Sequence, residues 1–99
     1  MINKPIIDKR EYEHVKLDNG LEAVIIYDKD TDVSAAALSV AVGYNDDPKE
    51  YQGLAHFLEH MLFMGTKKYP DENLYHKTIT ESGGVTNAHT ASDNTTYYF

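Results

Sequence analysis

Cysteine is absent from the 99-residue sequence, which excludes disulfide bonds and any metal site built from thiolates. A metal ion would have to be held by histidine, aspartate or glutamate side chains. Basic residues are also few, since 9 Lys and Arg stand against 16 Asp and Glu for a net charge of -7. Because a phosphate backbone attracts a basic surface, the composition excludes nucleic acid as a partner.

Long apolar segments are also missing, and none approaches the roughly 20 residues that a membrane-spanning helix needs. The N-terminal stretch MINKPIIDKREYEH has no continuous apolar core and carries acids as well as bases, unlike a secretory signal or a transit peptide. The sequence therefore predicts a cytoplasmic protein with no membrane partner. A length of 99 residues suffices for one small domain.

The N-terminal third predicts a β-hairpin followed by a third strand. In HVKLDNGLEAVII, two β-type segments flank Asp18-Asn19-Gly20, where glycine can adopt the positive φ that a tight turn requires. The segment VSAAALSVAVG, after the polar turn DKDTD, predicts the third strand.

Two helices and two short strands are predicted after it. The Asp47-Pro48 pair indicates the start of a helix that runs to residue 63 or 64, with Gly65 as its terminating glycine. The segment PDENLYHKTITESGG predicts a second helix, and VTNAHT and TTYYF predict strands joined by ASDN. The order β-β-β-α-α-β-β favours an α+β fold, an antiparallel-rich sheet with helices packed on one face.

The segment GLAHFLEHMLFMGT, residues 53–66, contains His56, Glu59 and His60 in an otherwise apolar stretch. Positions three or four apart share one face of a helix, so both imidazoles should lie together, with Glu59 between them and Phe63 continuing the same face. The opposite arc is expected to face the core. Its members are Leu54, Phe57, Leu58, Met61 and Leu62.

Two imidazoles at this spacing suit two ligands of a tetrahedral Zn²⁺ ion. Glu59 lies too close along the helix to be a good third ligand, but it is well placed to act as general base on a metal-bound water. The polar face of an ordinary amphipathic helix carries the same residue types. The motif alone leaves both interpretations open.

The longer segments HFLEHMLFMGTKKYPDEN and GGVTNAHTASDNTTYYF resemble the pitrilysin and insulin-degrading enzyme (insulinase) family of zinc metallopeptidases. These are the inverzincins, whose His-x-x-Glu-His motif reverses the commoner order. The resemblance runs from about Leu17 to Phe99 and is densest from Gly53 onward. It implies that residues 1–99 are the N-terminal part of a catalytic peptidase domain, within a larger α/β-roll domain, and that the parent protein is a zinc-dependent endopeptidase.

By this resemblance, His56 and His60 are zinc ligands and Glu59 is the general base that activates the zinc-bound water. The segment VTNAHT matches the family's edge strand, to which an extended peptide substrate adds as a further strand. Three residues are expected to contact substrate: Asn87, Ala88 and Phe63.

Several of these residues also fit ordinary structural roles. On sequence alone, Asn87 equally fits a turn or an edge strand, and Phe63 fits the core at the end of a helix. His89 lies on the edge-strand segment but is not expected to bind metal. His14 and His76 are interpreted as surface or structural histidines.

The family's third zinc ligand is a second Glu downstream of the motif, and no position matches it, so it is expected beyond residue 99. The sequence stops at Phe99 within a predicted strand, which suggests a piece of a longer polypeptide whose remainder is a partner. Alone, the 99 residues are expected to be inactive and to self-associate through exposed sheet edges. The alternative is an inactive homologue that binds peptides through edge strand 85–90 without cleaving them.

Overall fold

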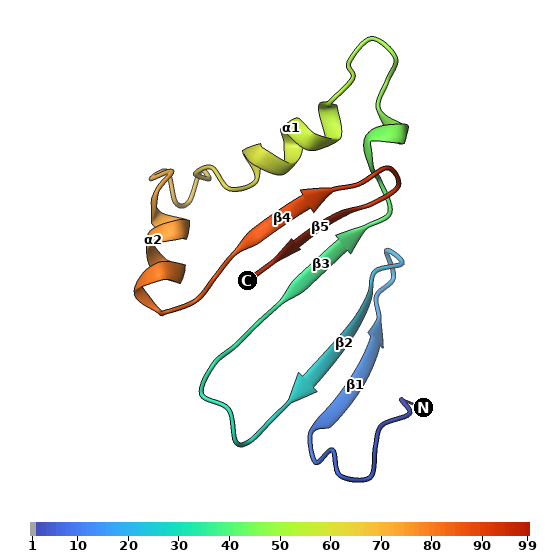
Figure 1. The fold of residues 1–99 in the computed structure, drawn as a ribbon, viewed down its shortest axis with the longest axis vertical. Coiled ribbons are helices and arrows are strands. Elements are labelled where there is room, and N and C mark those ends of the chain that lie inside the picture. The colour runs from blue at the N-terminus through green and yellow to red at the C-terminus, as the bar shows by residue number, and fades with distance from the viewer. Residues whose placement is uncertain (1) are drawn as a thin grey trace. The chain divides into compact units, whose positions relative to one another are not determined.

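The computed structural model describes residues 2–99, and its contacts divide the chain into two compact units, Met1–Ser34 and Ala35–Phe99. The elements follow in the order β1, β2, β3, a short 3-10 helix η1, α1, α2, β4 and β5 (Figure 1). This order of helices and strands is the predicted one, and it confirms the α+β class.

The first unit is a β-hairpin. Strand β1 (Glu11–Lys16) pairs antiparallel with β2 (Glu22–Tyr27), from Glu11 opposite Tyr27 to Lys16 opposite Glu22. Gly20 has a φ of 87° in the connecting turn, which explains why glycine occupies that position. The predicted hairpin and its turn are confirmed.

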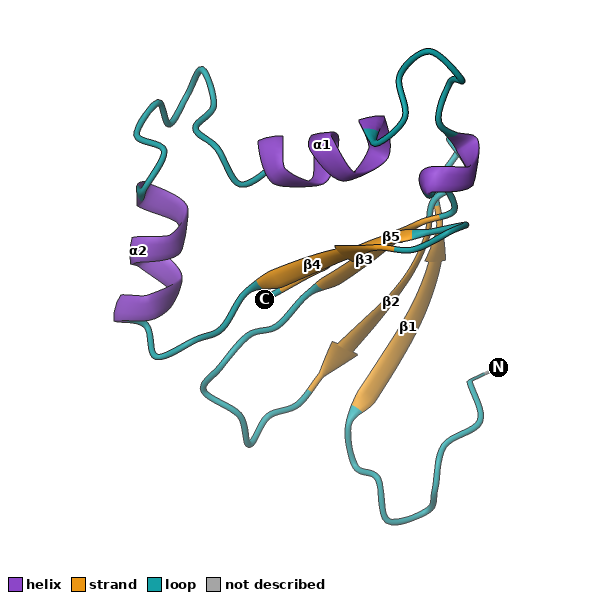
Figure 2. Ribbon diagram, turned by 45° about the horizontal axis from the view of Figure 1, so that its top comes forward, coloured by secondary structure: helices purple, strands orange, loops and turns teal. Residues whose placement is uncertain are grey.

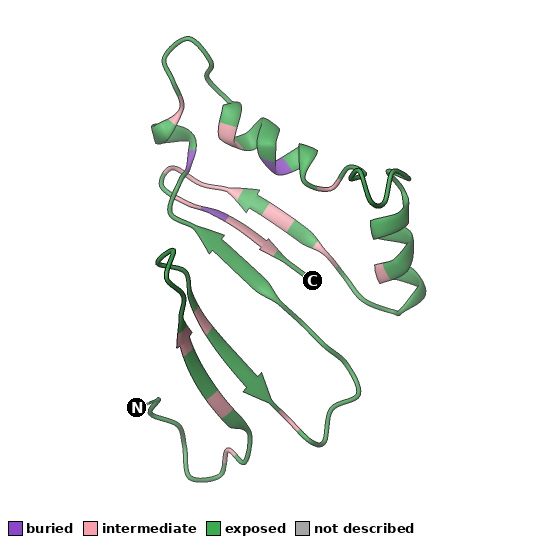
Figure 3. Ribbon diagram, turned by 180° about the vertical axis from the view of Figure 1, so that it is seen from behind, coloured by how far each residue is buried: buried purple, intermediate pink, exposed green. Residues whose placement is uncertain are grey.

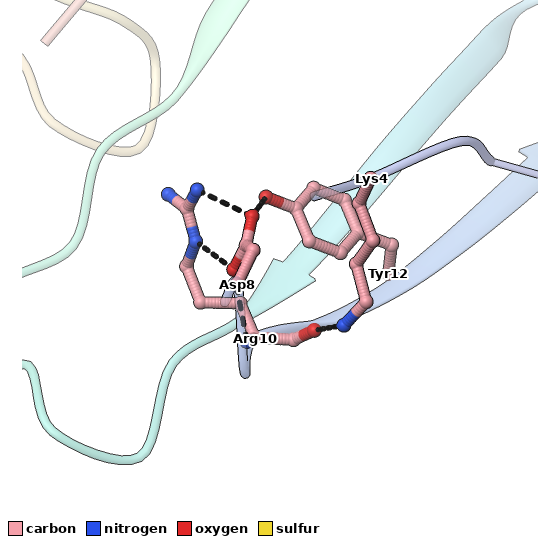
Figure 4. Close-up of polar contacts among 4 residues, drawn as sticks. All are labelled: Lys4, Asp8, Arg10 and Tyr12. Carbon is pink, nitrogen blue, oxygen red and sulfur yellow. Dashed lines mark hydrogen bonds and ion pairs between the residues drawn. The ribbon is translucent and has the colours of Figure 1, made fainter. Parts of the chain in front are cut away.

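A charged cluster precedes and enters β1 (Figure 4). Asp8 accepts hydrogen bonds from the Arg10 guanidinium at 2.7 and 2.9 Å and from the Tyr12 hydroxyl at 2.8 Å. Lys4 donates to the Arg10 carbonyl oxygen and lies 5.4 Å from the centroid of the Tyr12 ring. The bonds from Arg10, and then from Tyr12, hold the pKa of the Asp8 carboxyl well below its usual range.

The second unit contains a three-stranded antiparallel sheet with the strand order β3-β5-β4. Strand β5 (Thr95–Tyr98) is central, between β3 (Ala37–Val40) and β4 (Asn87–Thr90), as Figure 1 shows. Strand β3 is shorter than the predicted strand, although Ala36 and Phe99 extend its pairing through two backbone hydrogen bonds of 3.0 Å. Strand β4 is at an edge of this sheet, as expected.

Helix α1 (Leu54–Met61) corrects the predicted start of the first helix. The Asp47-Pro48 pair does not begin it, because residues 48–53 form turns after η1 (Tyr44–Asp46). Asp47 still caps α1 from upstream, since its carboxylate accepts hydrogen bonds from the backbone N–H groups of Gly53 at 2.7 Å and Ala55 at 2.9 Å. Asp47 thus bonds to the N-terminus of the helix, but the N-cap position is Gly53 and the predicted helix start is wrong.

The predicted helix ends need a smaller correction. Helix α1 stops at Met61 and tightens into i→i+3 hydrogen bonds through Met64, so Gly65 follows this final turn and not the α-helix itself. Helix α2 (Leu74–Glu81) begins at an Asn73 cap and is followed by Gly83 at a φ of 71°, a conformation that favours glycine after a helix end.

A close backbone approach fixes the connection from β3 to η1. Tyr44 and Asn45 donate backbone hydrogen bonds of 3.0 Å to the carbonyl oxygens of Ala91 and Ser92, in the turn between β4 and β5. Gly43, just before them, is buried, and a Cβ there would collide with the backbone of residues 91–93. Only glycine allows these two segments to approach so closely.

Helix α1 lies over β4 (Figure 2). The face that it turns to the sheet is not the predicted one. The apolar arc predicted as the core face is exposed, from 46% for Met61 to 63% for Phe57, whereas Glu59 is 7% exposed. Figure 3 shows that α1 is exposed over most of its length. Among residues 2–99 no apolar residue is buried, so the chain leaves this arc without a partner. No helix in the described chain has the length and apolar character to cross a bilayer.

Candidate metal centre and peptide-binding edge

Helix α1 brings the two histidines of the motif together. The Nε2 atoms of His56 and His60 lie 3.0 Å apart, and their ring centroids lie 4.7 Å apart. Both side chains are exposed, so the nitrogen pair is open to solvent. The predicted juxtaposition of the two imidazoles on one helical face is present.

Glu59 faces the sheet, where its side chain contacts β4. It is the only charged residue buried among residues 2–99. Its Oε2 atom accepts a hydrogen bond from the hydroxyl of Thr90 on β4. Because an ionised carboxylate in a buried position needs a hydrogen-bond donor, this contact offsets part of the cost of burial.

Strand β5 completes the surroundings of Glu59. Thr90 is paired with Thr95, which is 5% exposed and donates a hydrogen bond of 2.8 Å to the carbonyl oxygen of Val42. Burial, followed by the negative charge of Glu59, raises the pKa of the Tyr97 hydroxyl. Tyr97 is therefore neutral near pH 7 and adds no charge beside the carboxylate.

An open cavity of about 450 Å³ lies between α1, α2 and the start of β4. Glu59 and His60 line it, and the side chains of His76 and Phe63 are stacked at its wall with ring centroids 5.5 Å apart. The remaining lining residues are Met64, Glu72, Asn73, Thr86 and Asn87. Phe63 thus borders a cavity that Glu59 and His60 of the motif also line.

The candidate substrate residues lie at the start of β4. Asn87 is exposed and its side-chain Oδ1 accepts a hydrogen bond of 2.9 Å from the N–H of Ala88, which is half-buried and pairs with Tyr97. Nothing in residues 2–99 pairs with the outer edge of β4. That edge presents the backbone groups to which an extended peptide can add.

The histidine pair fits two positions of a zinc site. Nitrogens bound to tetrahedral Zn²⁺ at about 2.0–2.1 Å lie about 3.3 Å from each other, close to the observed 3.0 Å. The same distance suits an N–H···N hydrogen bond between the two rings. In residues 2–99, no three His, Asp or Glu side chains form a group that could hold a metal. The described residues therefore fit two positions of such a site and not the remaining ones.

The structure brings most of the predicted site residues together, and two further residues, Thr90 and His76, lie beside them. His56, His60 and Glu59 share α1, while His14 is exposed on β1 beside Glu22, and His89 is exposed on β4. Sequence reasoning missed Thr90 and assigned His76 no place near the motif. The available signal for Thr90 was the strand period of two, because residues two apart on β4 face the same side and Ala88 was already a candidate.

Comparison with protein families gives a direct match. Residues 22–99 match the model of the insulinase family, peptidase family M16. This match covers well over half of the chain, and the chain belongs to that family.

Named relatives are close in sequence. The chain is 54% identical over 95 residues to a Schizosaccharomyces pombe protein whose name includes the words "zinc protease". It is 50% identical over 98 residues to the insulin-degrading enzyme of Homo sapiens and 55% identical over 98 residues to the peroxisomal insulin-degrading enzyme-like 1 of Arabidopsis thaliana. Each alignment covers 96% or 99% of this chain but 10% of the relative.

The fold agrees with solved structures of proteases. A crystal structure of pitrilysin superposes with a TM-score of 0.87 at 43% identity, covering 98% of this chain and 10% of that one. A protease from Helicobacter pylori superposes with a TM-score of 0.73 at 35% identity, covering 90% of this chain and 21% of that one. The chain therefore corresponds to a small part of much longer proteins.

Proposed function

We propose that this chain carries the ligand pair and general base of a zinc-dependent endopeptidase whose remaining site residues lie elsewhere in a longer polypeptide. The observation that carries the proposal is the pair of imidazole nitrogens 3.0 Å apart, with the carboxylate of Glu59 one position from His60 on the same helix. Membership of the insulinase family and a relative named as a zinc protease support it.

His56 and His60 would hold Zn²⁺, which when bound polarises a carbonyl group and lowers the pKa of water. Glu59 takes a proton from the attacking water as general base and delivers it to the leaving amine. Burial suits this role, because a carboxylate shielded from bulk solvent keeps its proton within reach of the reacting groups.

The edge of β4 would bind the substrate. An extended peptide adds alongside residues 85–90 through main-chain hydrogen bonds, and Asn87 and Ala88 contact it near the scissile bond. In residues 2–99 the side-chain nitrogen of Asn87 has no acceptor, which leaves it available to a substrate carbonyl. Phe63 and the neighbouring cavity would hold a side chain beside the cut.

The chain alone is expected to lack useful activity, because two histidines bind zinc weakly without a third ligand. Its partners would be peptides and the rest of the polypeptide, and the cytoplasm is the proposed location. The exposed arc of α1 and the open edge of β4 favour self-association of the isolated chain.

The test compares zinc content and cleavage of a strand-forming peptide by the whole protein and by its Glu59→Gln variant. We expect wild type to bind one zinc and to cleave, and the variant to keep zinc but lose about 100- to 10,000-fold in kcat. Glu81→Gln on α2, where Glu81 is an exposed partner of Lys77, is the matched control and should cleave normally. Retained cleavage in Glu59→Gln would remove the proposed base.

The open edge of β4 also supports a second function, a peptide-binding module that does not hydrolyse its ligand. The same experiment separates the two functions. If the whole protein binds zinc and the peptide but leaves the peptide intact, the module is the better account.

A further inference from the structure

Thr90 lies on β4, outside the His-x-x-Glu-His motif. Its hydroxyl is the only donor to the Glu59 side chain within residues 2–99. We infer that Thr90 is a positioning residue, which holds the carboxylate of Glu59 in the orientation that general-base catalysis needs. The inference rests on the proposed function, because it assigns Thr90 a task only if Glu59 is the base.

The carboxylate of Glu59 needs an anchor because its side chain has three rotatable bonds and projects from a helix surface. A hydrogen bond to Oε2 fixes the direction of the whole carboxylate plane. The other oxygen, Oε1, has no partner in the described chain, and Glu59 borders the cavity that His60 and Phe63 also line. Thr90 thus holds Oε2, and Oε1 remains available to accept a proton from the attacking water.

The Thr90 hydroxyl is held in place by the strand that carries it. Thr90 ends β4, where it pairs with Thr95, and Thr95 is held by its own hydroxyl bond to Val42. Thr90 and Ala88 are half-buried, and between them His89 is exposed, so the hydroxyl points to the α1 side of the sheet. A donor on a paired strand loses little entropy when it orients a flexible carboxylate.

Thr90 also connects two parts of the proposed mechanism. The same strand that would pair with the peptide holds the carboxylate that would activate the attacking water. Strand β4 therefore fixes the distance between the bound peptide and the carboxylate of Glu59. This distance matters, because misplacement of a catalytic group by about 1 Å can cost about 100-fold in rate.

The experiment measures kcat, KM and zinc content in the whole protein for Thr90→Val, which keeps the shape and removes the hydroxyl, and Thr90→Ser, which restores it. We expect Thr90→Val to lose about 10- to 100-fold in kcat, the size expected for a hydrogen bond to a charged group, with KM and zinc unchanged. Thr90→Ser should recover most of that loss.

Thr96→Val is the matched control, because it removes a hydroxyl of the neighbouring strand that bonds to Ser39 and not to Glu59. It should leave kcat near wild type, so that a loss found only in Thr90→Val is not a general effect of removing a threonine hydroxyl from the sheet. A wild-type kcat in Thr90→Val would overturn the inference, as would equal losses in the Val and Ser variants. Failure of the proposed function looks different, since wild type would then not cleave at all or Glu59→Gln would cleave normally.

Discussion

Asp8 in the first unit and Glu59 in the second are both held by hydrogen bonds, but by opposite means. Asp8 is bonded by Arg10 and Tyr12, which lie two and four positions away, and its cation partner is exposed at the surface. Glu59 is buried and is bonded by one neutral hydroxyl, 31 positions later in the sequence. The first arrangement is local and charge-balanced, whereas the second is distant and leaves a charge uncompensated.

The difference indicates what each carboxylate is for. An ion pair at the surface contributes modestly to stability and needs nothing from the rest of the fold. A buried carboxylate with a single neutral donor costs stability, and an apolar side chain at position 59 would pack against β4 more favourably. Under the proposed function, Glu59 is present there for chemistry and not for folding, so function and stability should respond differently in the two units.

The largest expected contrast between the units concerns metal. In the whole protein, His56→Ala should lower zinc affinity by more than about 100-fold, since loss of a group that merely orients a ligand already costs about 10- to 100-fold. His14→Ala in the first unit removes an exposed histidine beside Glu22 and is the matched control. Zinc titration monitored by calorimetry gives both values. Equal affinities for the two variants would show that the α1 pair does not hold the metal.

Local patterns were sufficient for predicting the hairpin, the histidine pair and the element order. The Asp18-Asn19-Gly20 turn and the four-residue spacing of His56 and His60 each depend on neighbours along the chain. The face that α1 turns to the sheet was predicted wrongly, because periodicity identifies an apolar arc but not what covers it. The strand period of two places Thr90 on the same face as Ala88, but its contact with Glu59 depends on how α1 approaches β4, which that period does not specify.

The next contrast compares two glycines. Gly43→Ala in the second unit should destabilise by about 1–3 kcal/mol, because its Cβ would push against the backbone of residues 91–93 and displace the turn that follows Thr90. Gly20→Ala in the hairpin meets no atom within 4 Å, so only the strain of its positive φ remains, about 1 kcal/mol. Urea unfolding of the 99-residue chain measures both. A larger loss for Gly20→Ala would contradict the close approach at Gly43.

The smallest effect is a pH dependence confined to the hairpin unit. The pKa of Asp8 lies below its ordinary value of 3.8 in the folded state, chiefly because of Arg10, and that of Glu22 is lowered from 4.5, chiefly because of Lys16. A depressed pKa stabilises the folded state above the unfolded value, so this contribution is complete near pH 7 and is lost as the pH falls below about 4. Because Arg10, Lys16 and Glu22 are exposed, salt should weaken the effect.

Backbone chemical shifts of β1 and β2, followed from pH 7 to pH 2, measure the folded fraction of the hairpin. We expect wild type to lose hairpin signal at acid pH, and Asp8→Asn to lose less of it, because asparagine cannot form the ion pair with Arg10 at any pH. The remaining acid dependence in Asp8→Asn should come from Glu22 and disappear on adding Glu22→Gln. If Asp8→Asn has the same acid dependence as wild type, the cluster around Asp8 does not stabilise the hairpin. Asp8 would then not be the stabilising carboxylate with which Glu59 is compared.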